Sequence, residues 1–269
     1  MPLSPLRAGK ITASFAPWLM AGDAARILNE WFKLTGDPRF VAEDFSADWG
    51  VQFGIFIERF ALDWHERRKQ QELCRRGAFV VHPTLPHVGA TLDAYRPADN
   101  TVVDVKAIHA ASDIDQAVAF YTPQMVVQRA CVGADYAALL IVHGGQEPLE
   151  VIVPNVEEYE ARVFERIDQF WRCVQERVPP VEIVEAPPVT PPEQWRDINL
   201  DTDGANYNWA GDMAMHLRTW ADSHVAAKVN ETAREEIKRL LPENCRKLRF
   251  EAITVARNRA RAVSIKLTG

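Results

Sequence analysis

Apolar residues recur along the chain at two spacings, and together they predict a mixed α/β fold. Intervals of three and four predict amphipathic helices in four segments, at 21–34, 49–76, 113–133 and 156–178. Pro123 lies inside the third segment, so we expect that helix to begin near the proline. Short apolar or alternating runs predict strands at 79–82, 90–95, 101–108, 136–143 and 149–153. This order of elements predicts a central mixed sheet flanked by helices.

The second helix shows the spacing most clearly. Its apolar residues recur at three and four, which predicts that one stripe faces the core; they are Phe53, Ile57, Phe60, Ala61 and Trp64. Tryptophans at helical spacing elsewhere are likewise expected in the core rather than as platforms for stacked bases. They are Trp18, Trp31, Trp49 and Trp171.

The composition changes after residue 178. Six prolines lie between Val178 and Pro192, which predicts an extended linker or a strap over the surface. Beyond it, 210–241 is predicted to be helical, and 248–255 and 262–267 are predicted to be two strands around a basic turn. We therefore expect a core over 1–178, a proline-rich linker over 179–193, and a C-terminal extension of helix and β-hairpin over 194–269.

Size and charge limit the class of protein. With 269 residues and 47% hydrophobic content, the chain can form one substantial core and a smaller unit. It has no apolar run of membrane-spanning length, and its N-terminal segment lacks the apolar stretch of a signal peptide, so we expect a cytoplasmic protein without a membrane partner. The four cysteines are far apart with no C-x-x-C, which argues against zinc or an iron–sulfur cluster. The net charge of −6 alone would favour a small-molecule or protein partner over nucleic acid.

Asp93 and the run Val103-Asp104-Val105-Lys106 are the candidate chemical centre. Turn residues between them predict a hairpin that places both carboxylates on adjacent strands. Two carboxylates can hold a hard cation such as Mg²⁺, and a lysine two residues after the second carboxylate projects to the same face of a strand. This set suits metal-assisted phosphodiester cleavage. Taken alone, an Asp-x-Lys sequence is common by chance, and alternating charge on a strand is usually a solvated face.

Three further motifs accompany this hairpin in a fixed order. Arg7-Ala8-Gly9-Lys10-Ile11-Thr12-Ala13-Ser14 comes first, Gly54-Ile55-Phe56-Ile57-Glu58 lies before the hairpin, and Tyr121-Thr122-Pro123-Gln124 follows it. Over about residues 7–178, the ordered set resembles the PD-(D/E)xK nuclease superfamily. It most resembles the phage λ exonuclease and YqaJ-type viral recombinase family. The resemblance implies a restriction-endonuclease-like core.

The resemblance also implies roles for individual residues. Asp93, Asp104 and the backbone carbonyl of Val105 would bind Mg²⁺, and Mn²⁺ would substitute for it. Lys106 would orient the attacking water or neutralise the cleaved phosphate, and Glu58 would complete the acidic cluster through a second metal or a metal-bound water.

Three other residues receive roles in the same way. Gln124 would orient Lys106 or the phosphate, and Arg7 and Ser14 would bind the 5′-phosphate of a DNA end. Without the resemblance, Arg7 would be an ordinary exposed residue, Ser14 a helix cap, Glu58 a solvated helix residue and Gln124 a surface amide.

The function so implied is a Mg²⁺-dependent exonuclease that degrades one strand of double-stranded DNA from its 5′ end. The family implies phage-type recombination by strand annealing, a single-strand annealing protein as partner, and a ring-shaped homo-oligomer threaded by DNA. A ring that is acidic outside and basic inside would reconcile DNA binding with the negative net charge. Two alternatives stay open: a structure- or site-selective endonuclease of the same superfamily, and a DNA-binding scaffold that no longer cuts.

The sequence departs from the pattern of this family at two positions. Leu92 replaces a proline often found before the first aspartate, and Asp104 stands where λ exonuclease has glutamate.

The segment 246–266 has seven basic residues and one acidic residue. Its turn is therefore either a DNA contact or a solvated edge, and the candidate residues are Arg257, Arg259 and Arg261. The loop histidines His82 and His87 either touch DNA or have no role in the chemistry.

Overall fold

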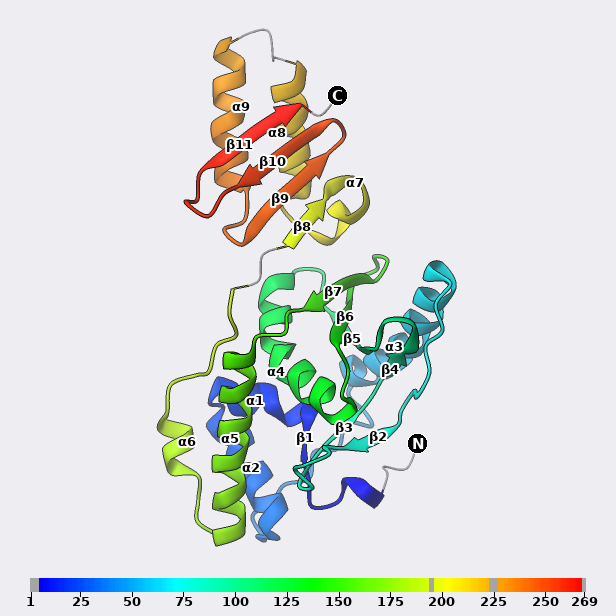
Figure 1. Ribbon diagram of the computed structural model, residues 1–269, viewed down its shortest axis with the longest axis vertical. Coiled ribbons are helices and arrows are strands. Elements are labelled where there is room, and N and C mark those ends of the chain that lie inside the picture. Colours follow the sequence, from blue (N-terminus) through cyan, green and yellow to red (C-terminus); the bar gives the residue numbers. More distant parts are fainter. Residues whose placement is uncertain (1–4, 194–195, 223–226, 268–269) are drawn as a thin grey trace. The chain divides into compact units, whose positions relative to one another are not determined.

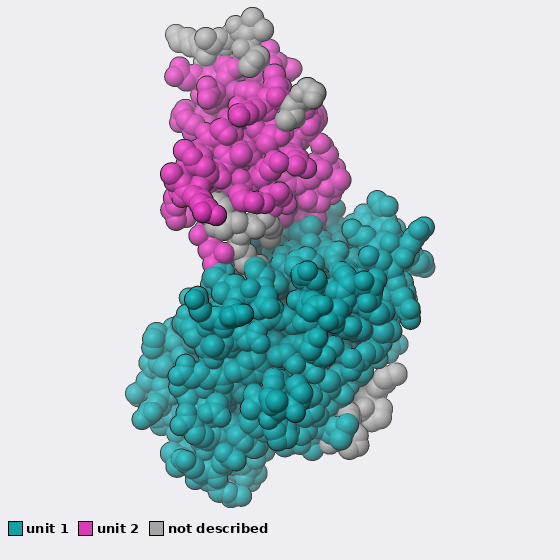
Figure 2. Space-filling model, viewed as in Figure 1, with its two compact units in different colours: residues 1–192 teal, residues 193–269 magenta. Residues whose placement is uncertain are grey.

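The computed structural model describes residues 5–193, 196–222 and 227–267 (Figure 1). The chain divides into two compact units, residues 1–192 and 193–269, which Figure 2 shows in different colours. Each unit has its own sheets and its own helices. Among the described residues, no helix combines the length and the apolar character needed to cross a bilayer.

Unit 1 is built around a four-stranded mixed sheet, in the order β4-β5-β6-β7. Strands β5 and β6 run parallel over their full length, and the other two pairs are antiparallel. The predicted strands β5, β6 and β7 are confirmed; the bounds of the sheet are Ala94–Arg96, Thr101–Ile108, Tyr136–His143 and Leu149–Val153. The central mixed sheet expected from the sequence is therefore present.

The predicted hairpin is confirmed in its second half only. Strand β4 pairs with β5, but the run at 90–95 is divided between two sheets. Its first half belongs to β3, which lies between β1 and β2; the bounds are Ile11–Thr12 for β1, Phe79–Val81 for β2 and Val88–Thr91 for β3. Asp93 thus lies between two strands rather than at the end of one, because the chain changes sheet at this point.

Helices cover both faces of the four-stranded sheet (Figure 1). Helix α3 packs on the face that carries Val103 and Val105, and α4 packs on the face that carries Asp104. The described helices of unit 1 are α1 (Ala16–Ala21), α2 (Ala24–Thr35), α3 (Trp49–Lys69), α4 (Ile114–Val132), α5 (Glu157–Glu176) and α6 (Val181–Glu185), with short 3₁₀ turns η1 (Pro5–Arg7), η2 (Ala13–Phe15) and η3 (Pro97–Asp99).

The expected start of α4 at Pro123 is wrong. The helix begins at Ile114, where Asp113 accepts a hydrogen bond from the backbone N–H of Gln116, and it continues through the proline. A proline inside a helix costs about 3 kcal/mol. Buried side chains before and after Pro123 offset this cost, because both halves of the helix pack on the sheet.

The expected core stripe of α3 is also largely wrong. The helix ends at Lys69 and buries Ala61, Leu62 and His65, while Trp49 is 81% exposed and Phe56 69% exposed. Five exposed rings form what we call the α3 aromatic stripe: Trp49, Phe53, Phe56, Phe60 and Trp64. Their positions fall within about 80° of the helix circumference, opposite the buried side. Helical spacing identified residues that share a face, but α3 is apolar on two faces.

The proline-rich segment packs on unit 1 as a strap. The N–H of Val189 donates to the carbonyl of Met20 at 2.8 Å, and the side chain of Arg166 donates to the carbonyl of Pro187 at 3.0 Å. Ile183 and Val189 are both buried. Of the two alternatives for this segment, the structure has the surface strap.

Unit 2 is a four-stranded sheet, in the order β11-β10-β9-β8, with two helices packed on one face. The predicted strand at 248–255 is two strands, because the chain turns at Glu251, whose φ is 50°. The predicted hairpin between β10 and β11 is present. The elements are β8 (Arg196–Asn199), α7 (Leu200–Asp203), η4 (Gly204–Asn206), α8 (Ala210–Asp222), α9 (Ala227–Leu240), β9 (Cys245–Phe250), β10 (Ile253–Arg257) and β11 (Val263–Leu267).

Candidate active site

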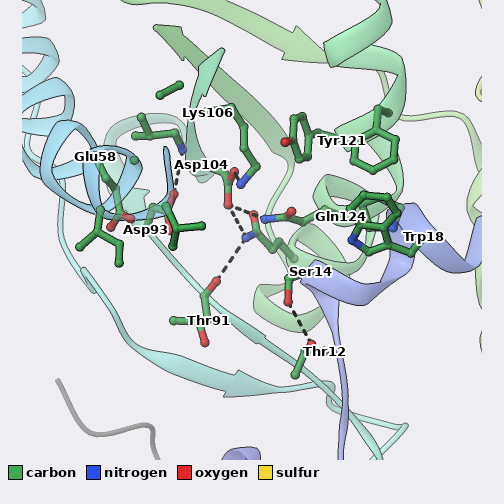
Figure 3. Close-up of a pocket in the computed structure, with 18 of the residues that line it drawn as sticks. Thr12, Ser14, Trp18, Glu58, Thr91, Asp93, Asp104, Lys106, Tyr121 and Gln124 are labelled. Atoms are coloured by element: carbon green, nitrogen blue, oxygen red, sulfur yellow. Dashed lines mark hydrogen bonds and ion pairs between the residues drawn. The ribbon is translucent and has the colours of Figure 1, made fainter. Parts of the chain in front are cut away.

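One pocket of unit 1, with a volume of about 530 Å³, brings the predicted site residues of that unit together (Figure 3). They come from six separate places in the fold: η1, η2, α3, the junction between β3 and β4, β5 and α4. The lining includes Arg7, Ser14, Glu58, Asp93, Asp104, Val105, Lys106 and Gln124.

Strand β4 is short, and this opens one edge of β5 to the pocket. The β4–β5 pairing ends at Val103, so the N–H of Val105 has no strand partner on that side. It donates instead to Oδ2 of Asp93 at 2.8 Å. The carbonyl of a strand residue points to the same edge as its own N–H. Val105 therefore presents its carbonyl on the side where Asp93 lies.

Asp104 is the most enclosed acid of the site, with only 1% of its surface exposed. Its Oδ1 accepts hydrogen bonds from Nε2 of Gln124 at 2.7 Å and from Nε2 of Gln128 at 2.8 Å. Its Oδ2 lies 2.5 Å from Nζ of Lys106, two residues along the same face of β5. The predicted shared face of Asp104 and Lys106 is confirmed.

Two residues of α4 complete this arrangement without having been assigned to it from the sequence. Gln128 donates to Asp104 and also to the carbonyl of Thr91 at 3.2 Å, and so ties β5 to β3. The ring centroid of Tyr121 lies 4.9 Å from Nζ of Lys106, a cation–π distance. The signal was present in the sequence: positions 121, 124 and 128 share one helical face.

Burial and mutual repulsion perturb the site electrostatically. Burial raises the pKa of Asp93 well above its usual value, and the charge of Asp104 raises it further. The pKa of Glu58 is raised by the same two causes, burial first. Burial alone would lower the pKa of Lys106, but Asp104 and Asp93 outweigh it and the pKa is raised. Three carboxylates face one ammonium, so a cation would relieve the excess negative charge.

The donor set fits Mg²⁺. Among the described residues, no three His, Cys, Asp or Glu side chains converge as metal ligands. Magnesium does not require three, because it keeps several waters and commonly uses one or two carboxylates. Asp93, Asp104 and the Val105 carbonyl supply oxygen donors only, and the pocket lining contains neither histidine nor cysteine. A hard, oxygen-seeking ion is therefore the appropriate occupant.

Arg7 and Ser14 line another wall of the same pocket. Strand β1 pairs in parallel with β3, Thr12 opposite Gly89, and this brings the N-terminal segment beside the acidic cluster. The Oγ atoms of Ser14 and Thr12 lie 3.0 Å apart, and Ser14 is exposed. Trp18, expected in the core, is only partly buried and also lines the pocket.

Other candidates lie elsewhere. The ring of His87 stacks on Trp171 at 4.6 Å, and His82 meets Phe164 at 5.2 Å, so both histidines pack against α5. The three arginines of the basic turn belong to unit 2, where Arg257 is the last residue of β10 and Arg259 and Arg261 follow it.

One departure from the family has a structural reason. The N–H of Leu92 donates to the carbonyl of Ala78 at 2.9 Å, and the side chain is fully buried. A proline cannot make this bond because it has no N–H. Leucine at this position therefore secures the segment that carries Asp93.

Comparison with solved structures identifies the fold. A crystal structure of the alkaline exonuclease LHK-Exo from Laribacter hongkongensis aligns with a TM-score of 0.53 and 16% identity, over 65% of this chain and 93% of that one. A second structure of LHK-Exo, in complex with dAMP, aligns with a TM-score of 0.54 and 19% identity, over 64% of this chain and 90% of that one. The chain shares the fold of this exonuclease.

A phage-related exonuclease from Haemophilus somnus aligns with a TM-score of 0.49 and 14% identity, over 62% of this chain and 94% of that one. No protein-family model matches the sequence, and a search of curated proteins finds no match. The two LHK-Exo structures confirm the mixed α/β fold class that was expected from the sequence.

Proposed function

We propose that this protein is a Mg²⁺-dependent exonuclease that degrades one strand of double-stranded DNA from its 5′ end. The observation that carries the proposal is the meeting of Asp93, Asp104 and Lys106 with Arg7 and Ser14 in one pocket. An acidic pair with a lysine suits phosphodiester cleavage, and an arginine with a hydroxyl suits a terminal phosphate. The fold shared with an alkaline exonuclease supports the same activity.

Asp93, Asp104 and the Val105 carbonyl would hold the Mg²⁺ ion, and Mn²⁺ would fit the same oxygen donors. When bound, the ion supplies a Lewis acid that polarises the scissile phosphate. Gln124 and Gln128 fix the rotamer of Asp104 through its Oδ1, so that Oδ2, which pairs with Lys106, is the oxygen that would bind the ion. Their role is to hold a ligand carboxylate in one position.

Lys106 orients the attacking water and neutralises charge that develops on the phosphate. The neighbouring Asp104 and Asp93 raise its pKa, which favours the protonated ammonium. Glu58, from α3, adds a third carboxylate at the rim of the acidic cluster, where it accepts a proton or provides a further metal contact.

Arg7 and Ser14 would set the direction of digestion. A guanidinium offers a rigid pair of donors for phosphate oxygens, and the Ser14 hydroxyl adds another donor. A pocket that binds a terminal 5′-phosphate beside the acidic cluster places the first phosphodiester of that strand within reach of Lys106.

The binding of Mg²⁺ should be visible in the stability of the protein. Because Asp93 and Glu58 have raised pKa values in the fold, their stabilising contribution is present at low pH and is lost as the pH rises through those values. At pH 7.5, saturating MgCl₂ should raise the melting temperature of unit 1 by about 5–10 °C, which corresponds to ~2.7 kcal/mol at a hundred times the Kd. Differential scanning fluorimetry at constant ionic strength measures the shift.

The matched variants are Asp93→Asn and Asp168→Asn. An asparagine side chain in place of Asp93 keeps an acceptor for the Val105 N–H but removes the buried charge. The metal-free variant should therefore be at least as stable as wild type, and its Mg²⁺ shift should be lost. Asp168, on α5 and paired with Arg172, lies outside the pocket and its variant should keep the full shift. A full Mg²⁺ shift in the Asp93→Asn protein would contradict the metal assignment.

Two other functions fit the same residues. An endonuclease of the superfamily would use the same acidic cluster on internal phosphodiesters, and a scaffold would bind DNA without cutting it. The pocket residues Arg7 and Ser14 favour an end-directed enzyme. Digestion of a single plasmid distinguishes the exonuclease, the endonuclease and the scaffold. The plasmid is supplied either covalently closed or linearised, and each form is incubated in MgCl₂ and in EDTA. We expect loss of the linear form alone, and in MgCl₂ alone.

We further propose that the protein works in the cytoplasm as a ring-shaped homo-oligomer, with a single-strand annealing protein as its partner in phage-type recombination. The annealing partner and the recombination role rest on the resemblance in sequence. The α3 aromatic stripe supports self-association, because large aromatic side chains side by side on an exposed helix face are unusual in a monomer. Such a stripe is typical of the centre of a protein interface.

Replacing two exposed phenylalanines of the stripe should therefore weaken self-association. We expect Phe56→Gln with Phe60→Gln to raise the dissociation constant of the oligomer by about 100-fold or more, since burial of each phenylalanine stabilises by roughly 1.5–3 kcal/mol. Sedimentation velocity measures the change. The control, Ile152→Gln with Met215→Gln, alters two side chains that are 48% and 53% exposed outside the stripe. A wild-type protein that sediments as a monomer, or equal effects in both variants, would contradict self-association through α3.

A further inference from the structure

The sheet of unit 2 has two unlike faces. One face is apolar and packs against α8 and α9; its residues include Leu248, Phe250, Ile253 and Val255, all buried. The strand register places the alternate residues on the other face, where Arg249, Thr254 and Lys266 lie side by side across three strands, and so do Lys247, Ala256 and Ser264. We call these six residues the open sheet face. Half of them are cations, and the other half are small.

A bulge in β9 turns Lys247 to this face. The register between β8 and β9 shifts after Cys245, so that Arg246 is an extra residue in the strand. Such an insertion reverses the alternation of side chains beyond it. Cys245 accordingly faces the core, and Lys247 and Arg249 face outward. On the edge strand β8, Asp197 lies opposite Lys247 and Asn199 lies opposite Arg249. Arg246 pairs with Asp197 at 3.3 Å, which offsets the charge of this acid.

The cations of the open sheet face are unpaired. Within the part of the chain that the structure describes, Lys247, Arg249 and Lys266 form no ion pair. The other layer of the same unit differs, because on α9 Lys238 pairs with Glu235 and Arg239 pairs with Glu236. The open sheet face therefore brings together three cations that form no ion pair among the described residues, in a protein whose net charge is −6.

The register also separates the three arginines of the basic turn. Arg257 lies opposite Val263 on the helix-covered side, and its Nη2 donates to the carbonyl of Leu241 at the end of α9, at 3.0 Å. It thus contributes to the packing of unit 2. Arg259 and Arg261 are exposed in the turn that joins β10 to β11. These two continue the charge of the open sheet face, and Arg257 does not.

We propose that the open sheet face binds the sugar–phosphate backbone of DNA, a second contact that rests on the proposed function of unit 1. Unpaired cations on a rigid sheet are complementary to a polyanion, and they gain by releasing its counterions. Strands lie ~4.8 Å apart, so Arg249 and Lys266 stand roughly 10 Å apart with only Thr254 between them. Small residues between the cations let a backbone approach closely.

The composition of the face also indicates how DNA is recognised. β-Sheets that bind single-stranded nucleic acid carry aromatic side chains on which the bases stack. The open sheet face has no aromatic residue, so it cannot select bases in this way. The contact is therefore to phosphates, is independent of sequence, and accepts duplex DNA. It would keep a nuclease on its substrate without taking part in cleavage.

The test compares two triple variants of the full chain that lose the same charge. Lys247→Gln, Arg249→Gln and Lys266→Gln neutralise the open sheet face. Their control neutralises three exposed cations of α9: Arg234→Gln, Lys238→Gln and Arg239→Gln. Fluorescence anisotropy in EDTA measures binding to a duplex of mixed sequence closed by hairpin loops at both ends, between 50 and 200 mM KCl.

We expect the open-face variant to bind more weakly and to flatten the slope of log affinity against log salt by about 2.7, since each lost phosphate contact removes roughly 0.9. The control should keep the wild-type slope, and both should melt as wild type does. An unchanged slope in the open-face variant, or equal flattening in the control, would overturn the proposal. The proposal would also be overturned if the open-face variant lost binding to phosphatidylserine vesicles but kept its binding to DNA, because the face would then bind a membrane.

The closed duplex separates this proposal from the one for unit 1. It has no ends and is never cut in EDTA, so its binding does not depend on the acidic cluster. If the enzyme cleaves DNA but the open-face substitutions leave its salt slope unchanged, only the proposed DNA contact of the open sheet face is contradicted. If the protein does not cleave DNA but shows the expected change of slope, the DNA contact of the open sheet face is supported and the nuclease activity of unit 1 is contradicted.

Discussion

The substitutions Asp104→Asn and Lys106→Met are each expected to reduce cleavage of linear duplex DNA by about 10³-fold or more while the protein stays folded. Asparagine is the sharper choice at position 104, because alanine would leave the amides of Gln124 and Gln128 without their shared acceptor. An unpaired buried donor costs about 1–3 kcal/mol and would confuse loss of fold with loss of chemistry. The asparagine side chain still accepts both bonds but removes a ligand charge.

Methionine at position 106 keeps an unbranched apolar side chain of similar length and removes the ammonium that lies over the Tyr121 ring. Initial rates on a linear duplex in MgCl₂ measure the effect, and melting curves report the fold. The matched controls are Asp168→Asn and Lys33→Met, which change the same groups in surface ion pairs of α5 and α2. Near-normal rates in either site variant, with wild-type melting, would remove its residue from the chemistry.

Digestion of a 5′-phosphorylated end is expected to be about 10- to 100-fold faster than digestion of a 5′-hydroxyl end, and Arg7→Gln should remove most of this preference. A charge-assisted hydrogen bond to phosphate contributes on the order of 1.5–3 kcal/mol, which gives that ratio. Arg7 is half-buried at the pocket wall, so the terminal phosphate would meet it partly shielded from water.

The readout is the ratio of kcat/KM for two duplexes that differ only in the 5′ group. Arg39→Gln is the control, because Arg39 is an exposed arginine that pairs with Asp37 and lies outside the pocket lining. Ser14→Ala should reduce the same ratio by a smaller factor, since a neutral donor contributes less than a charged one. If both ends are digested at equal rates, the assignment of Arg7 and Ser14 to a 5′-phosphate is wrong.

Local patterns predicted which residues of the candidate site share a face of one element. Asp104 and Lys106 are two apart on a strand, so alternation alone puts them on one face. Tyr121, Gln124 and Gln128 share a face of α4 by helical spacing, although the role of Gln128 needed the structure, since only the fold brings that face to Asp104. Composition marked the proline-rich segment as an extended linker or a strap, and the contacts of Val189 and Pro187 with unit 1 show which of the two it is.

Other features depend on tertiary context. Helical spacing found the rings of α3 but could not tell that Ala61 and Leu62 face the sheet while the rings face outward. A proline rule placed the start of α4 too late, because it could not weigh the packing on both sides of Pro123. In unit 2, the bulge at Arg246 reverses the alternation of β9, and only strand register shows which cations gather on one face.

The most direct test of the central proposal is digestion of a linear duplex that carries 5′-phosphates and a fluorescent label at one 3′ end. The digestion is carried out in MgCl₂ and in EDTA, and the products are separated on a sequencing gel. Our account predicts, in MgCl₂ only, labelled fragments that shorten progressively from the 5′ end of the labelled strand while mononucleotides accumulate. Immediate release of the label, which marks digestion from the 3′ end, or the same digestion in EDTA, would contradict it.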